Sequence, residues 1–205
     1  MTSSVNIVDR DTTIRTLPLD ERRGVYAMWC VIATEASLFF CLYGAYFYLG
    51  NRMQRWSANQ PPKLHYAWIM LVVLLVSGFL LRWGESRIKE ARYPIGRLAM
   101  FVTFVLGLGF LVLQSFAYVE HMQTLTPYSN SYGSIFYAIS AFHVAHVVIG
   151  VLILAYTCCL PRYGATSEAP YRPYQTAALY WYFVIALYIS VFIILYIIPN
   201  LLVYG

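Results

Sequence analysis

The sequence predicts an all-α membrane protein, a polytopic bundle of five transmembrane helices. Hydrophobic residues make up 60% of its 205 positions and charged residues 11%, whereas about a quarter of the residues in a soluble domain are charged. The apolar residues form continuous runs of about the length, roughly 20 residues, that a helix needs to cross the hydrocarbon core. A membrane β-barrel would instead show segments of about ten residues with period-two alternation, so the pattern favours helices.

Five apolar runs qualify as transmembrane spans. The predicted spans are residues 25–49, 65–83, 98–119, 134–160 and 177–198. Together they form a transmembrane domain over residues 25–205. Most prolines fall at or between the predicted helix ends, where a missing amide hydrogen costs little, and Pro199 is expected to close the last span.

The distribution of basic residues predicts how the helices are oriented. The N-terminal tail and the second–third and fourth–fifth connections carry 11 of the 14 Lys and Arg residues, and the opposite side carries three. By the positive-inside rule the N-terminus is cytoplasmic, and five spans then place the C-terminus outside. The net charge of +5 therefore reflects topology and not nucleic-acid binding. Residues 1–24 lack the apolar core of a signal peptide and are expected to form a cytoplasmic tail.

Glu35 is the only acidic residue well inside a predicted span. It lies about ten residues from one end of the first span, which at about 1.5 Å per residue is near the middle of the membrane. An acid costs a few kcal/mol there even on lenient insertion scales, so its carboxyl should face protein or water. Two interpretations stay open: a proton-linked or partner-contacting carboxyl, and a neutral acid that makes an interhelical hydrogen bond.

His143 and His146 lie three residues apart in the fourth span and share one helical face. A metal centre would need further ligands, but the remaining histidines, His65 and His121, lie near span ends, and the four cysteines show no C-x-x-C spacing. We therefore expect no metal site. The pair should hydrogen-bond to neighbouring helices or lipid headgroups, with axial ligation of a haem as the alternative.

Three motifs give the chain a resemblance to a known family. They read TEASLFF at 34–40, LGLGFLVLQSFAY at 106–118, and YGSIF at 132–136 followed by FHVAHVVIG at 142–150. The chain resembles subunit III of haem–copper oxidases, the cytochrome c oxidase and quinol oxidase group, in its short five-helix bacterial form. The resemblance extends over residues 24–204, and the fourth-span motif is its most specific part.

The chain also departs from the family's usual pattern. The family usually has Glu where Ala117 stands, Gly where Val144 stands, and W-H-F-V-D where residues 181–185 read WYFVI. The contacts of the lost His and Asp must be absent or replaced, and the Tyr182 hydroxyl is the candidate replacement. The chain therefore resembles a divergent branch.

The resemblance implies a non-catalytic subunit with no redox centre or cofactor of its own, in the bacterial cytoplasmic (inner) membrane. Its partners would be the catalytic subunit I, which holds haem and copper, other respiratory subunits, and bound phospholipid. It would stabilise the catalytic subunit and support proton uptake, while the complex couples oxygen reduction to proton translocation. Glu35 takes the place of the family's intramembrane carboxyl. Helix packing or lipid contact is expected for the other polar residues of the pattern: Arg97, Gln114, Tyr132, His143, His146 and Tyr182.

Two other functions stay open at this point. An accessory subunit of a nitric oxide reductase, or of another quinol-linked respiratory complex, would keep the same fold, and the altered fifth span leaves room for it. A small proton-coupled carrier could use Glu35 and the histidine pair. Transporters usually show repeat symmetry and interrupted helices, and neither is apparent in the sequence.

Overall fold

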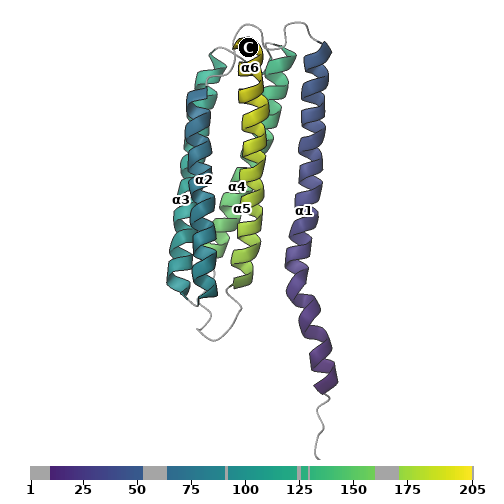
Figure 1. Cartoon of the computed structure of the whole chain (residues 1–205), viewed down its shortest axis with the longest axis vertical. Helices are drawn as coiled ribbons and strands as arrows, with labels where there is room; N and C mark the ends of the chain where they lie inside the picture. Colours follow the sequence, from purple (N-terminus) through teal and green to yellow (C-terminus); the bar gives the residue numbers. More distant parts are fainter. Residues whose placement is uncertain are drawn as a thin grey trace, which may run out of the picture.

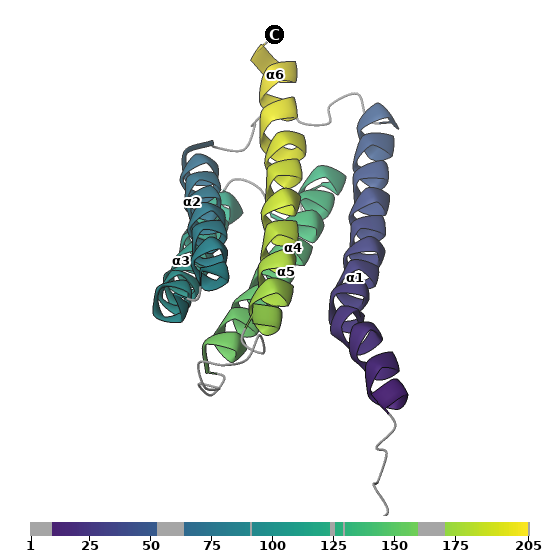
Figure 2. The ribbon, with the colours of Figure 1, turned by 60° about the horizontal axis from the view of Figure 1, so that its bottom comes forward.

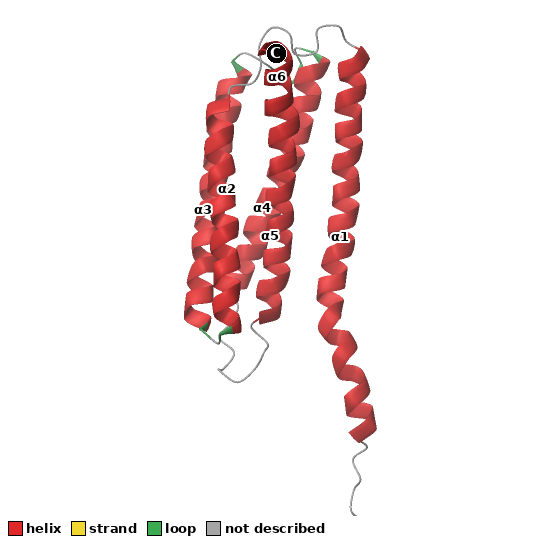
Figure 3. Ribbon diagram, viewed as in Figure 1, coloured by secondary structure: helices red, strands yellow, loops and turns green. Residues whose placement is uncertain are grey.

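The computed structural model describes residues 10–52, 64–90, 92–123, 126–128, 130–159 and 171–204. These residues form long helices and contain no strand (Figure 1, Figure 3). The elements are α1 (Arg10–Arg52), α2 (Leu64–Lys89), α3 (Tyr93–Met122), α4 (Ser131–Cys159), α5 (Tyr171–Phe192), the π-helical turn η1 (Ile193–Ile197) and α6 (Ile198–Tyr204).

Five stretches of the described chain are long and apolar enough to cross a membrane. They are Gly24–Asn51, Leu64–Lys89, Tyr93–Met122, Ser131–Cys159 and Pro173–Leu201. The last stretch runs through α5, η1 and most of α6 without a break. The predicted class, an all-α membrane bundle of five spans, is confirmed.

Helices α2 to α5 form one bundle, and α1 lies along its side (Figure 1, Figure 2). α2 and α3 are the most closely paired helices, α3 packs on α4, α4 on α5, and α5 on α2, while α1 contacts α4 and α5. Only 6% of the positions in the most apolar part of α1 are buried, against 33% to 50% in the other four spans. Among the five spans, the most apolar part of α1 therefore has the smallest share of positions buried by the rest of the chain.

A single tryptophan in α5 contacts the other three helices of the bundle, α2, α3 and α4. Trp181 of α5 is fully buried, and its indole Nε1 donates a hydrogen bond to the Ser77 hydroxyl of α2 at 3.0 Å. Its ring lies against Gly107 of α3 and Gly150 of α4, where an added Cβ would come within 2.8 Å and 2.9 Å of ring carbons. The two glycines leave the space that the ring occupies, as small residues do at close helix contacts in membranes.

The helices extend beyond several of the predicted span ends. α2 continues to Lys89 and α3 begins at Tyr93, although apolarity alone had ended one span at residue 83 and begun the next at 98. Glu85 pairs with Arg82 at 3.0 Å and with Lys89 at 3.2 Å, and such pairs at spacings of three and four stabilise polar helical turns. At the other end of the chain, α1 begins at Arg10 and so includes much of the expected tail.

Pro199 does not close the last helix, contrary to the sequence-based expectation. The chain passes through the π-helical turn Ile193–Ile197 and remains helical to Tyr204. The Ile198 amide donates to the Ile193 carbonyl, five residues back, and the Asn200 side-chain amide donates to the Tyr196 carbonyl at 2.8 Å. The helix thus continues past Pro199, which has no amide hydrogen to donate, and the π-helical turn lies directly before it.

Candidate functional site

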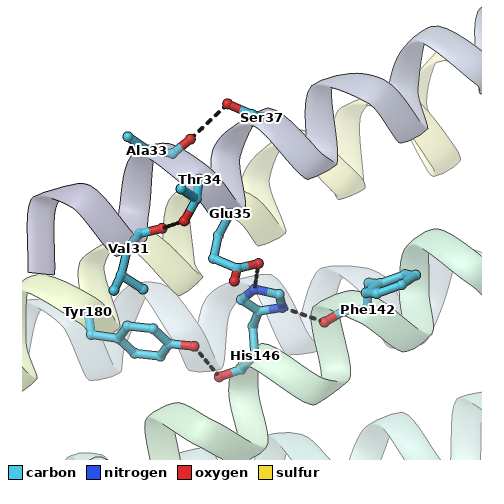
Figure 4. Close-up of polar contacts among 8 residues, drawn as sticks. All are labelled: Val31, Ala33, Thr34, Glu35, Ser37, Phe142, His146 and Tyr180. Atoms are coloured by element: carbon cyan, nitrogen blue, oxygen red, sulfur yellow. Dashed lines mark hydrogen bonds and ion pairs between the residues drawn. The ribbon is translucent and has the colours of Figure 1, made fainter.

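The most distinctive polar contact inside the membrane joins Glu35 of α1 to His146 of α4 (Figure 4). Glu35 Oε2 lies 3.1 Å from His146 Nε2. The His146 side chain is 7% exposed and the Glu35 side chain 36% exposed. The sequence had marked both residues independently, and the structure brings them together.

The second ring nitrogen of His146 determines what the pair can do. His146 Nδ1 lies 2.7 Å from the Phe142 carbonyl oxygen, which can only accept, so Nδ1 must carry a hydrogen. In one arrangement Nε2 accepts a hydrogen bond from the protonated, neutral Glu35 acid. In the other, Nε2 belongs to an imidazolium and donates a hydrogen bond to a Glu35 carboxylate. The pair has no net charge in either of these two arrangements.

Aromatic side chains enclose the histidine end of this pair. The Phe39 ring of α1 meets the His146 ring edge-on with centroids 5.3 Å apart, and the Phe183 ring of α5 lies at 6.3 Å. The Tyr180 hydroxyl of α5 points at the His146 backbone carbonyl from 3.5 Å (Figure 4). The imidazole is therefore fixed among three helices, while the carboxyl remains partly open. Phe39 was identifiable from sequence only as a residue four positions after Glu35, on the same helical face.

His143 has a different environment from His146. Its Nε2 lies 3.3 Å from the Val184 carbonyl oxygen of α5, so this nitrogen acts as the donor. The ring is packed against Phe110 of α3 and Tyr188 of α5, with centroids 5.7 Å and 5.2 Å away. The two histidines thus bond to separate helices. Among the described residues, no group of three or more His, Cys, Asp and Glu side chains is placed to hold a metal ion.

The remaining predicted polar residues do not gather around the Glu35–His146 pair. Gln114 is buried in α3. Tyr132 is buried at the start of α4, with its ring 6.3 Å from the Tyr46 ring of α1, and Tyr182 is partly buried in α5. Arg97 is exposed at the start of α3 and donates from Nη2 to the Cys158 carbonyl at the end of α4, at 3.1 Å. Tyr132 and Arg97 therefore lie at opposite ends of the bundle.

The sequence-based reading missed Glu85. Glu85 is 8% exposed, and its carboxyl forms ion pairs with Arg82 and Lys89 of the same helix. Apolarity had assigned the residue to a connection, so its burial was not expected. The signal was the spacing of three and four between Glu85 and the two cations.

Comparison with known proteins shows which family the chain matches. The family model described as cytochrome c oxidase subunit III matches residues 21–199. The chain is similar to cytochrome c oxidase subunit 3 of Drosophila yakuba, with 32% identity over 126 residues, 60% of this chain and 47% of that protein. It is also similar to the subunit 3 proteins of Myxine glutinosa and Paracentrotus lividus, each with 28% identity over 83% of this chain and 68% of theirs. The chain thus aligns with about half of the Drosophila yakuba protein and about two thirds of the other two.

Proposed function

Because the chain belongs to the cytochrome c oxidase subunit III family, we propose that it is a non-catalytic subunit of a respiratory haem–copper terminal oxidase. The observation that carries this proposal is the family match over residues 21–199, which takes in all five spans except the last residues of the fifth. Haem and copper would reside in partner subunits, above all in catalytic subunit I. This chain would bind phospholipid and stabilise the catalytic subunit.

The Glu35–His146 pair supports a further role in proton uptake by the complex. The two side chains form a hydrogen bond near the middle of the first span, where an isolated charge is costly. A proton can move between the two side chains without changing the net charge of the pair. A hydrogen-bonded pair of this kind is therefore better suited to a proton-linked role than a fixed ion pair is.

The other predicted residues have structural roles in this proposal. Gln114, His143 and Tyr182 contribute to helix packing through buried or partly buried polar groups. Arg97 and Tyr132, at opposite ends of the bundle, would also be in reach of lipid headgroups. The proposed location is the bacterial cytoplasmic membrane, with the N-terminus and the basic α2–α3 connection on the cytoplasmic side.

Purification from native membranes in mild detergent tests this proposal. We expect the tagged chain to copurify with a large membrane subunit that contains haem and copper and reduces oxygen. Copurification with a nitric oxide-reducing subunit would contradict the oxidase assignment. Proton-coupled flux by the chain reconstituted alone would contradict a purely accessory role, and a Glu35→Gln variant would show whether such flux depends on the carboxyl.

A further inference from the structure

Gln114 of α3 places a polar amide inside the bundle. The residue is 5% exposed, and in the part of the chain that the structure describes no other residue forms a hydrogen bond with this amide. Lipid chains cannot serve instead, because they carry no hydrogen-bonding groups. A buried amide without a partner is costly, and buried polar groups are nearly always hydrogen-bonded to protein or to water. The Gln114 amide therefore needs a partner.

His143 of α4 has one ring nitrogen engaged and one that can still accept a hydrogen bond. Nε2 donates to the Val184 carbonyl at 3.3 Å, so in the neutral ring the other nitrogen, Nδ1, is an acceptor. The neutral ring is the form expected for a side chain that is 2% exposed inside an apolar bundle. None of the described residues donates a hydrogen bond to Nδ1. His143 thus offers an acceptor, whereas the Gln114 amide offers both a donor and an acceptor.

Two contacts between α3 and α4 fix the register of these antiparallel helices. Gly107 of α3 lies against α4, because an added Cβ would be 2.8 Å from Val151 Cγ2. Farther along α3, the Tyr118 hydroxyl donates to the Ser140 hydroxyl of α4 at 3.0 Å. The step from Gly107 to Tyr118 along α3 equals the step from Val151 back to Ser140 along α4. The α3 residues between the two contacts can therefore be matched to their neighbours in α4.

This register places Gln114 level with His143. Phe110 lies one turn before Gln114 on the same face of α3, and its ring is 5.7 Å from the His143 ring. Phe110 is 0% exposed, whereas Gln114 and His143 keep small exposed fractions, so neither of the two polar side chains is completely enclosed. No direct hydrogen bond joins them in the described chain. Polar groups that lie at one level but do not reach each other are a setting for a bridging water.

We infer that one ordered water molecule binds between Gln114 and His143 and joins α3 to α4. The water donates one hydrogen to His143 Nδ1. It also either donates to the Gln114 amide oxygen or accepts a hydrogen bond from the amide nitrogen, and two hydrogen bonds are within the range that buried waters make. The water thereby supplies a partner to both side chains and holds the His143 ring in one tautomer. This site belongs to the chain itself, so the inference goes beyond the proposed function and does not depend on it.

Solid-state NMR on the full chain in lipid bilayers tests the inference. His143 is the only histidine that follows a phenylalanine, so isotope labels on the Phe carbonyl carbon and throughout His single out its signals. Magnetisation transferred from water protons should reach the His143 ring at Nδ1, although the ring lies inside the bundle. Absence of this transfer in the wild-type chain would overturn the inference.

Two Leu substitutions in α3 distinguish a water held by Gln114 from water that reaches His143 by another route. Gln114→Leu replaces the amide with an apolar side chain of similar size, and Ser115→Leu places the same side chain at the exposed neighbouring position as a matched control. The Gln114→Leu chain should lose the transfer to Nδ1, and the Ser115→Leu chain should retain it. Equal transfer in the wild type and in Gln114→Leu would contradict a water held by the amide.

A conservative substitution separates loss of the amide from a general change in packing. Gln114→Glu keeps a hydrogen-bonding group at the same reach, so this chain should retain the transfer to His143. Circular dichroism of each variant checks that its helices are formed. Loss of the transfer in both Gln114→Leu and Gln114→Glu would show that hydrogen bonding at position 114 does not hold the water, and would contradict the inference.

Discussion

Glu35 and His146 behave as one unit at the scale of single residues. The Phe142 carbonyl holds a hydrogen on His146 Nδ1 at 2.7 Å, which leaves Nε2 to face the Glu35 carboxyl at 3.1 Å. Their hydrogen bond can form between a neutral acid and a neutral imidazole, or between a carboxylate and an imidazolium, and the pair has no net charge in either arrangement. Such a pair tolerates a low-dielectric membrane interior without a separate counter-ion.

Substitution of Glu35 separates the hydrogen bond from the proton. Glu35→Gln keeps a donor, since the amide can donate to His146 Nε2, whereas Glu35→Ala removes the contact. We expect the Ala variant to lose about 1 kcal/mol of stability and the Gln variant to lose less. Thermal unfolding of each variant in detergent, monitored by the loss of the helical circular dichroism signal, measures the two changes in stability. Equal destabilisation by Gln and Ala would contradict a bond in which the Glu35 side chain is the donor.

Sequence reasoning found the polar residues of the site but not all of their partners. Glu35 and the histidines were apparent because charged and imidazole groups are rare inside apolar runs. Their pairing was not apparent, because Glu35 and His146 are 111 positions apart and nothing in one sequence fixes how two helices are rotated. The partner of His143 is the backbone carbonyl of Val184, which carries no side-chain signal at all.

At the scale of elements, the Trp181 slot is the space between Gly107 and Gly150 that the Trp181 ring fills. This slot determines how closely α3, α4 and α5 approach one another. Gly107 and Gly150 supply the space for the ring, and Ser77 of α2 accepts its indole hydrogen bond at 3.0 Å. The W-Y-F-V-I segment thus keeps its tryptophan at the centre of the bundle. At the end of the same segment, Ile185 packs against α2, with its Cδ1 2.7 Å from where a Gly78 Cβ would lie.

Two glycines of α3 provide a matched test of this slot. At Gly107 an added Cβ would lie 2.8 Å from Trp181 Cη2, whereas at Gly109 it would meet nothing within 4 Å. We expect Gly107→Ala to destabilise the bundle, because overpacking costs about 1–3 kcal/mol and the helix-propensity gain of about 1 kcal/mol offsets only part of it. Gly109→Ala should be neutral or stabilising.

Unfolding of the two variants in the same detergent, compared with the wild type, measures the difference. A Gly107→Ala protein as stable as Gly109→Ala would show that the ring does not fill the slot between α3 and α4.

The elements themselves were predictable where apolarity decides and unpredictable where it does not. All five spans were identified because each is a continuous apolar run. Their ends were misplaced between α2 and α3, because ion pairs and the close approach of Gly84 to Ala99 keep polar residues helical. The π-helical turn before Pro199 was missed, because proline normally ends a helix and apolarity alone does not indicate a π-helical turn.

At the scale of the whole molecule, the helices form a four-helix bundle with α1 attached at its side (Figure 2). Phe39, Tyr46, the Tyr43–Ser190 hydrogen bond at 2.6 Å and the Glu35–His146 contact join α1 to α4 and α5. Fewer positions are buried in the most apolar part of α1 than in that of any of the other four spans. The sequence predicted that α1 spans the membrane, but not that α1 would lie at the side of the bundle against α4 and α5.

The orientation in the membrane follows from charge and is testable on the intact chain. A tag at the C-terminus should be digested by external protease in spheroplasts, and a tag at the N-terminus should be digested only after lysis. The reason is that 11 of 14 basic residues lie on the side assigned to the cytoplasm. Digestion of the N-terminal tag in intact spheroplasts would contradict this orientation.

The central claim is that this chain is a subunit of a haem–copper oxidase without a redox centre of its own. The most direct measurement is the haem and copper content of the purified complex before and after this chain is stripped from it with a stronger detergent. Both haem and copper should remain with the large subunit, and the separated chain should contain neither. Haem or copper that leaves the complex with this chain, in stoichiometric amount, would contradict the claim.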